Sequence, residues 1–287
     1  MQKILTALGA AAMLSMSTLS ALAEYPERPI TIVVPFAAGG PTDTVTRLVA
    51  ESMSKDLGQQ VVVENVGGAG GTLGAFEYVG LVTEVPMTIV ARKDLEPTDL
   101  KGLVEYAKAN KDTVTVANAG IGAASHLCGM LFMTAIGTPL VTVPYKGTGP
   151  AMTDLLGGQV DIMCDQTTNT TKQIQGGTIK AYAVTTAKRL DVLPDVPTTD
   201  EGGLPGMQVG IWHGLYAPKG TPADVTEKLS KALQAALKDE NVVARFAELG
   251  TTPSSEADAT PAALKAKLES EIARWKPIIE AAGQYAD

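Results

Sequence analysis

Two short glycine-containing segments carry the polar residues whose types and spacing suit the binding of an anion. The first, residues 35–43, follows a β-branched run and precedes apolar residues at helical spacing. Gly39 and Gly40 allow a tight turn, and Thr42 and Asp43 are good helix N-caps. A helix that begins there leaves backbone N–H groups without partners, with partial positive charge, at the end of a strand. This arrangement predicts a site for a small anion.

The second segment, residues 119–126, has the same order of elements. A strand is followed by a turn with Gly120 and Gly122 and then by a helix that Ser125 can cap. Two such helix N-termini can each hold one carboxylate, or they can hold the same carboxylate from two sides. Each segment alone is also what an ordinary strand-to-helix turn of an α/β protein contains.

The spacing of the reactive side chains disfavours nucleophilic catalysis and metal binding. Ser125 and His126 are neighbours at a helix start, so their side chains diverge, and the sequence has no G-x-S-x-G turn. The two histidines and two cysteines show no zinc-binding spacing. His213 can pack in the core or form a cleft wall, and Asp165 can reach a cleft or lie at a solvated strand end. A secreted hydrolase is therefore the weaker alternative.

A nucleotide cofactor is disfavoured as well. The glycines at 120 and 122 are followed by Ser125 where a dinucleotide motif needs a third glycine, and no acidic residue lies near position 143. The glycine-rich residues 67–74 contain no lysine for a phosphate loop. We expect no cofactor and no metal.

The N-terminus and the composition predict export. Residues 1–23 combine Lys3, a largely apolar run and a small-residue cleavage site, as in a secretory signal, and the run is too short for a membrane span. The formal net charge of −8 argues against nucleic acid as a partner. In an exported chain Cys128 and Cys164 can form a disulfide or remain two buried thiols. We favour the disulfide, because both lie at one edge of the predicted sheet.

Alternating strand and helix patterns predict an α/β protein with a mainly parallel sheet. Separate strands are expected at residues 78–83 and 87–91, and a helix capped by Thr98 is expected at residues 98–109. The join between the strand at 61–64 and the strand at 78–83 is unusual. Only residues 72–76 can be helical there, whereas a parallel crossover needs about a dozen residues or more.

Several sequence blocks together resemble the Bug-type (TctC-like) substrate-binding proteins of tripartite tricarboxylate transporters. They run in the family's order through nearly all of the chain after the signal. The blocks are Tyr25-Pro-x-x-Pro29, Ile32-Val-Val-Pro-Phe-Ala-Ala-Gly-Gly-Pro-Thr-Asp43, Val61-Val-Val-Glu-Asn65, Gly68-Ala-Gly-Gly71, Ala119-Gly-Ile-Gly-Ala-Ala-Ser-His126, Val143-Pro-Tyr-Lys-Gly147, Thr153-Asp-Leu-Leu-Gly-Gly-Gln-Val-Asp161, Leu193-Pro-Asp-Val-Pro-Thr198, Gly214-Leu-Tyr-Ala-Pro218 and Gly220-Thr-Pro222.

The resemblance implies a periplasmic, monomeric, two-lobed clamshell of the type II binding-protein fold. It would bind a small organic acid and deliver it to the membrane permease subunits of a tripartite tricarboxylate transporter, without catalysis. Lobe one would be residues 24–92 and 215–287, and lobe two residues 93–214. The ligand-binding residues implied are Phe36, Ala37, Ala38, Gly39, Gly40, Thr42, Asp43, Gly120, Gly122, Ala123, Ala124, Ser125, His126, Asp165, Gln166 and Thr168.

The sequence departs from the family pattern at one place. Family members usually carry several dozen more residues between Ala75 and Phe76, which supply a crossover helix and a strand. Lobe one is therefore expected to be incomplete, with one sheet face partly uncovered. A receptor remnant that no longer binds, or that serves a sensor partner, is the alternative that this departure raises.

Overall fold

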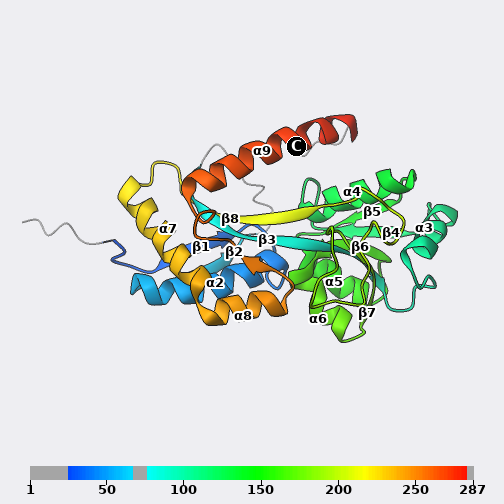
Figure 1. Cartoon of the computed structure of the whole chain (residues 1–287), viewed down its shortest axis with the longest axis horizontal. Helices are drawn as coiled ribbons and strands as arrows, with labels where there is room; N and C mark the ends of the chain where they lie inside the picture. Colours follow the sequence, from blue (N-terminus) through cyan, green and yellow to red (C-terminus); the bar gives the residue numbers. More distant parts are fainter. Residues whose placement is uncertain (1–24, 67–75, 283–287) are drawn as a thin grey trace, which may run out of the picture.

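The computed structural model describes residues 25–66 and 76–282. The predicted signal sequence lies outside the described residues, as does most of the helical stretch predicted at residues 72–76. None of the helices within these two ranges combines the length and apolar character needed to cross a membrane. Figure 1 shows two halves joined by β3 and β8, one formed by the N- and C-terminal segments and the other by the middle of the chain.

The elements alternate as an α/β sequence pattern predicts. The strands are β1 (Ile30–Val34), β2 (Val61–Asn65), β3 (Phe76–Arg92), β4 (Thr115–Asn118), β5 (Val141–Pro144), β6 (Ile162–Gln166), β7 (Ile179–Val184), β8 (Gly210–Pro218) and β9 (Thr252–Pro253). The helices are α2 (Pro41–Leu57), α3 (Leu100–Ala109), α4 (Ala124–Ile136), α5 (Thr148–Leu156), α6 (Thr167–Gln175), α7 (Ala223–Lys238), α8 (Glu240–Glu248) and α9 (Pro261–Ala282).

The long strand β3 replaces the two separate strands expected at residues 78–83 and 87–91. Its first part pairs antiparallel with β8 and β9, and its last part pairs antiparallel with β6 and β7. Pro86 lies between the two sets of partners, where β8 is its one paired neighbour among the described strands. A proline has no N–H to donate to a neighbouring strand. A long strand can therefore tolerate a proline at a position such as this one, where only one of its two sides is paired.

The sheet of the second half is mixed, and the expectation of a mainly parallel sheet is wrong in this respect. Its strand order is β5-β4-β6-β3-β7. β4 pairs parallel with β5 and β6, whereas β3 runs antiparallel to β6 and β7. Helices pack on this sheet around a core that includes Leu103, Phe132 and Ile162.

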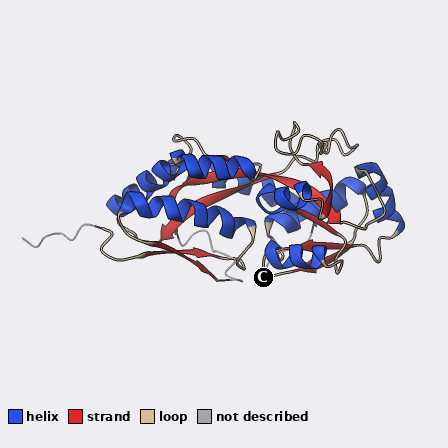
Figure 2. Ribbon diagram, turned by 90° about the horizontal axis from the view of Figure 1, so that it is seen from below, coloured by secondary structure: helices blue, strands red, loops and turns tan. Residues whose placement is uncertain are grey.

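In the first half, β1 and β2 form a separate parallel pair. One face packs on α2 in a core with Val49, Met53 and Phe246. On the other face Val33 is 54% exposed and Val62 is 41% exposed. Figure 2 shows this short pair at the lower left, apart from the long strands. These exposures agree with the narrower prediction that one sheet face of the first half is partly uncovered.

The predicted helix caps are wrong at three helices. The N-cap of α3 is Asp99, whose side chain accepts a hydrogen bond from the Gly102 N–H, and not Thr98. The N-caps of α2 and α4 are Gly40 and Ala123, and neither helix has a side-chain cap. Of the polar residues expected as caps, Asp43 and Ser125 instead accept hydrogen bonds from the loops that precede α2 and α4, and the Thr42 hydroxyl lies 3.2 Å from His213 Nε2.

Candidate functional site

A cavity of about 1180 Å³ lies between the two halves and extends into the first half. At its interlobe end it reaches the N-termini of both α2 and α4. The polar groups there come from five places in the sequence that the fold brings together. They are Thr42 with Asp43, Ser125, Thr148, Gln166 and His213.

The loop before α2 is fixed by Asp43. Its Oδ2 accepts hydrogen bonds from the Gly39 N–H and from Arg47 Nε, both at 3.0 Å. Burial alone would raise the pKa of Asp43, but the hydrogen bonds from Arg47, Gly39 and Asn65 outweigh burial and hold the pKa below its usual value. The carboxylate is therefore ionised at neutral pH and positions the loop. The Gly39 N–H, expected to be free for an anion, is already occupied.

The loop before α4 uses its N–H groups in the same way. Ser125 Oγ accepts from the Ala119 N–H at 2.9 Å, and His126 Nδ1 accepts from the Gly122 N–H at 3.3 Å. The Gly120 N–H donates to Asn118 Oδ1 at 2.9 Å. The N–H groups of Gly39, Gly120 and Gly122 thus already have acceptors close by in the sequence.

The first-turn N–H groups of the two helices are the donors that remain. α2 begins with Pro41, which has no N–H, and its first helical hydrogen bond is donated by the Thr44 N–H to Gly40. The N–H groups of Thr42 and Asp43 therefore have no acceptor within the helix. In α4 the Leu127 N–H donates to Ala123, so the N–H groups of Ala124 and Ser125 also have no acceptor within the helix. These N–H groups provide the positive end of each helix dipole.

A third strand-to-helix turn, residues 145–149, closes the gap between the halves. The Ala37 N–H donates to the Lys146 carbonyl at 2.9 Å. A Cβ on Gly149 would lie 3.2 Å from the Ala38 carbonyl oxygen, so the two loops are in close contact. The site residues predicted from the sequence do not include this turn. Its strand, glycines and following helix repeat the pattern that identified the other two loops, which is the signal that could have found it.

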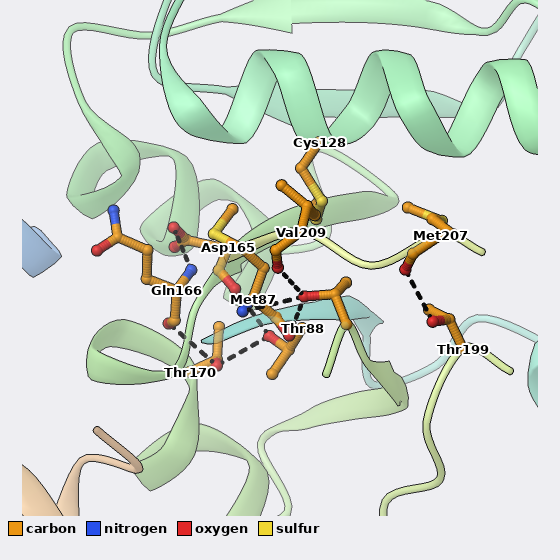
Figure 3. Close-up of a disulfide and its surroundings, with 11 residues drawn as sticks. Met87, Thr88, Cys128, Asp165, Gln166, Thr170, Thr199, Met207 and Val209 are labelled. Atoms are coloured by element: carbon orange, nitrogen blue, oxygen red, sulfur yellow. Dashed lines mark hydrogen bonds between the residues drawn. A yellow bond between two sulfur atoms is a disulfide. The ribbon is translucent and has the colours of Figure 1, made fainter. Parts of the chain in front are cut away.

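Asp165 is fully buried and does not lie at a solvated strand end. Its carboxylate accepts from the Gln166 N–H at 2.8 Å (Figure 3). It also accepts from Asn169 Nδ2 at 2.5 Å. Burial raises the pKa of Asp165 to about 6, against the opposing effect of the hydrogen bonds from Asn169, Gln166 and Thr148. Asp165 does not line the cavity, so its role is to position the residues that do.

Gln166 and His213 each present a buried polar atom without a partner at the cavity wall. Gln166 Oε1 and His213 Nδ1 have no hydrogen bond to any described residue. His213 Nε2 lies 3.2 Å from Thr42 Oγ1. Burial lowers the pKa of His213 to about 4, so the ring is neutral at pH 7. Buried polar atoms are nearly always paired, which indicates that a ligand or water satisfies these two.

The predicted site residues fall into two groups. Those that line the cavity are Phe36, Gly40, Thr42, Asp43, Ala123, Ala124, Ser125 and Gln166. Those that do not line the cavity are Ala37, Ala38, Gly39, Gly120, Gly122, His126, Asp165 and Thr168. The structure adds Ala119, Thr148, Trp212 and His213 to the lining. The sequence allows His213 either to pack in the core or to form a cleft wall, and in the structure it lines the cavity.

Cys128 and Cys164 are joined in a disulfide between α4 and β6, with their Cα atoms 5.8 Å apart (Figure 3). Both are buried in the core of the second half. The bridge ties α4, whose N-terminus reaches the cavity, to the strand that ends at Gln166. Among the residues the structure describes, no group of three His, Cys, Asp or Glu side chains is placed to hold a metal ion.

Known proteins match this chain over most of its length. The family model described as "Tripartite tricarboxylate transporter family receptor" matches residues 75–284. A protein of Agrobacterium vitis, encoded in the TAR-I ttuE-ttuC' intergenic region, is 54% identical over 91% of this chain and 86% of its own. The solved structure of the periplasmic binding protein BugD is 51% identical, with a TM-score of 0.87, over 90% of this chain and 99% of that one. MatC from Rhodopseudomonas palustris, solved with bound malate, is 36% identical, with a TM-score of 0.84, over 89% of this chain and 100% of that one. The chain has the α/β fold of these binding proteins and belongs to the tripartite tricarboxylate transporter receptor family.

Proposed function

We propose that this protein is a periplasmic receptor that binds a small organic carboxylate between its two halves and delivers it to a tripartite tricarboxylate-type membrane permease. The lobe division at residues 24–92 with 215–287 and at residues 93–214 is part of this proposal, as is export by residues 1–23. No catalytic step is involved. The ligand is a mono-, di- or tricarboxylate.

The observation that carries this proposal is the pair of unpartnered buried atoms, Gln166 Oε1 and His213 Nδ1, at the wall between two helix N-termini. The free N–H groups of α2 and α4 suit a carboxylate oxygen. His213 is neutral, and if Nε2 accepts from Thr42, then Nδ1 carries the proton and donates to the ligand. Gln166 Oε1 accepts from a ligand hydroxyl or a protonated carboxyl group. The malate bound to MatC has a hydroxyl group between its carboxylates.

A thermal-shift panel of carboxylates, followed by calorimetry on each hit, tests the proposal. A ligand at 100 times its dissociation constant stabilises the folded state by about 2.7 kcal/mol, which raises the melting temperature measurably. Replacing Gln166 with Leu should weaken binding about 2- to 10-fold, since a buried hydrogen bond contributes roughly 0.5–1.5 kcal/mol.

The matched control is Gln208→Leu, which changes an exposed side chain outside the cavity. It should leave affinity as in the wild type. If no acid shifts the melting temperature of well-folded protein, or if both Gln variants bind equally well, the site is misassigned. The first result would favour the non-binding or sensor-type receptor.

A further inference from the structure

A fully buried carboxylate is hydrogen-bonded to two residues of the cavity lining. Asp165 is 0% exposed and accepts from the Gln166 N–H (Figure 3). Its other two donors are the side chains of Asn169 and Thr148. Gln166 and Thr148 line the cavity, whereas Asp165 and Asn169 do not. Two of the three groups that hold this carboxylate therefore also face the space where the proposed ligand binds.

Thr148 connects Asp165 to the N-terminus of α2. Its side chain forms a hydrogen bond with the Asp165 carboxylate. In the other direction, a Cβ on Gly40 would lie 3.9 Å from Thr148 Oγ1, and Gly40 is the N-cap of α2. One hydroxyl group thus separates the buried carboxylate from a helix N-terminus that suits a ligand carboxylate. Because Asp165 is buried, water screens the repulsion between these two negative charges only weakly.

No lysine or arginine among the described residues pairs with Asp165. The charged and titratable side chains on the elements that contact β6, and on those across the cavity from it, are Glu77, Tyr78, Glu84 and Arg92 on β3, His126 on α4, Asp154 on α5, Lys172 on α6, Asp43 and Arg47 at the start of α2, and His213 on β8. Arg92 pairs with Asp161 at the opposite end of β6, and Arg47 pairs with Asp43. Asp165 is left with uncharged donors.

We propose that Asp165 is a positioning residue that makes ligand binding depend on pH: a carboxylate ligand binds together with a proton, and Asp165 takes up that proton. This inference rests on the proposed function and adds the linkage to pH. The proton moves from solvent to a carboxylate oxygen, and no other covalent bond changes. Protonated Asp165 can still accept from the Gln166 N–H, and its O–H can donate to Thr148, because a hydroxyl group both donates and accepts.

The direction of the pH dependence follows from the charges. Burial raises the pKa of Asp165 to about 6 in the protein without ligand. A ligand carboxylate disfavours the ionised form and raises the pKa further, to about 7 if the two charges are about 10 Å apart at an effective dielectric constant of about 20. At pH 6 the bound protein then holds the proton more fully than the free protein, whereas at pH 8 neither holds it. Ligand affinity should therefore fall about 5-fold from pH 6 to pH 8.

Isothermal titration calorimetry in buffers of different ionisation enthalpy counts the protons that are taken up with the ligand. The probes are malate and succinate, each titrated into the purified protein at pH 6.5. With pKa values of about 6 and about 7, about half a proton should be taken up for each ligand bound. Asp165→Asn should lose this uptake and the 5-fold dependence of affinity on pH.

Two comparisons assign the proton to Asp165. The difference between the wild type and Asp165→Asn removes the contributions of every other titrating group, including His126 and the ligand itself. Asp56→Asn, at an exposed position outside the cavity lining, is the matched control and should take up protons as the wild type does. If Asp165→Asn does not fold, NMR of the Asp165 carboxyl carbon in the wild type replaces it. The titration midpoint of that carbon should rise by about one pH unit when malate is added.

The outcomes separate this inference from the proposed function. Binding without proton uptake, equal uptake by the wild type and Asp165→Asn, or an unchanged titration midpoint would overturn the proposal and leave carboxylate binding intact. If neither malate nor succinate binds, the proposal is also overturned. The thermal-shift panel then shows whether the proposed function fails with it, because another acid of the panel would still stabilise a functional receptor.

Discussion

Replacement of the buried Asp165 by Asn should remove a pH dependence from the stability of the second half. Burial raises the pKa of this carboxyl from 3.8 to about 6. The folded state therefore holds a proton that the unfolded state has lost, and the free energy of unfolding falls as pH rises from about 4 through 6. The difference between the two pKa values corresponds to about 3 kcal/mol, at 1.36 kcal/mol for each pH unit.

The asparagine variant cannot ionise and should not show this loss. Its side chain can still accept from the Gln166 N–H, and the amide of Asn169 can rotate to present its oxygen. Urea denaturation without ligand, at several pH values from 4 to 7.5, measures the free energy of unfolding of both proteins. The variant should gain about 3 kcal/mol relative to the wild type across this range.

The pH range from 4 to 7.5 separates the effect of Asp165 on the free energy of unfolding from the effects of other carboxylates. Asp43 and Asp161 have lowered pKa values in the folded state, so the stability that they contribute is present at neutral pH and is lost as pH falls below about 4. Asp56→Asn, at an exposed position, is the control and should follow the wild type. A wild-type-minus-variant difference that stays constant from pH 4 to 7.5 would refute the assignment of the burial cost to Asp165.

Three further outcomes are expected. Gly80→Ala should destabilise the protein by about 1–3 kcal/mol in urea denaturation, because the alanine Cβ would lie 2.9 Å from backbone atoms of Ala259. The control is Gly210→Ala, whose Cβ would lie 3.6 Å from its nearest atom and which should change stability by less than about 0.5 kcal/mol. Gly39→Val should strain the backbone, because Gly39 has φ 83°, at a cost of about 1–2 kcal/mol or more. No atom lies within 4 Å of the position of the new Cβ, so the changed loop conformation is the expected cause of the effect. The carboxylate-induced thermal shift should be abolished. Thiol titration of denatured, unreduced protein should detect no free thiol at Cys128 or Cys164 and two after reduction; two thiols before reduction would contradict the bridge.

Local patterns in the sequence predicted most of the elements and two of the loops that contribute residues to the cavity lining. β-branched runs followed by glycines and apolar helical spacing identified the loops before α2 and α4, because a strand-to-helix turn is encoded within about ten residues. The same local logic failed at the caps. Asp43 and Ser125 are suitable cap residues, but each accepts a hydrogen bond from its own loop instead. That choice depends on Arg47 and on the loop conformation, and not on residue type.

Only the tertiary structure decided which groups meet. Nothing in the sequence near Pro86 indicates that β3 continues past it, since that depends on partners from β6 to β9. The contact of Ala37 with Lys146 and the placement of His213 beside Thr42 join residues far apart in the chain. Burial of Asp165 is likewise a property of the packed halves. Local propensity acts within a few residues. Strand pairing and burial depend on contacts between atoms that are far apart in the sequence and meet only when the chain folds. The pKa values that follow from burial depend on the same contacts.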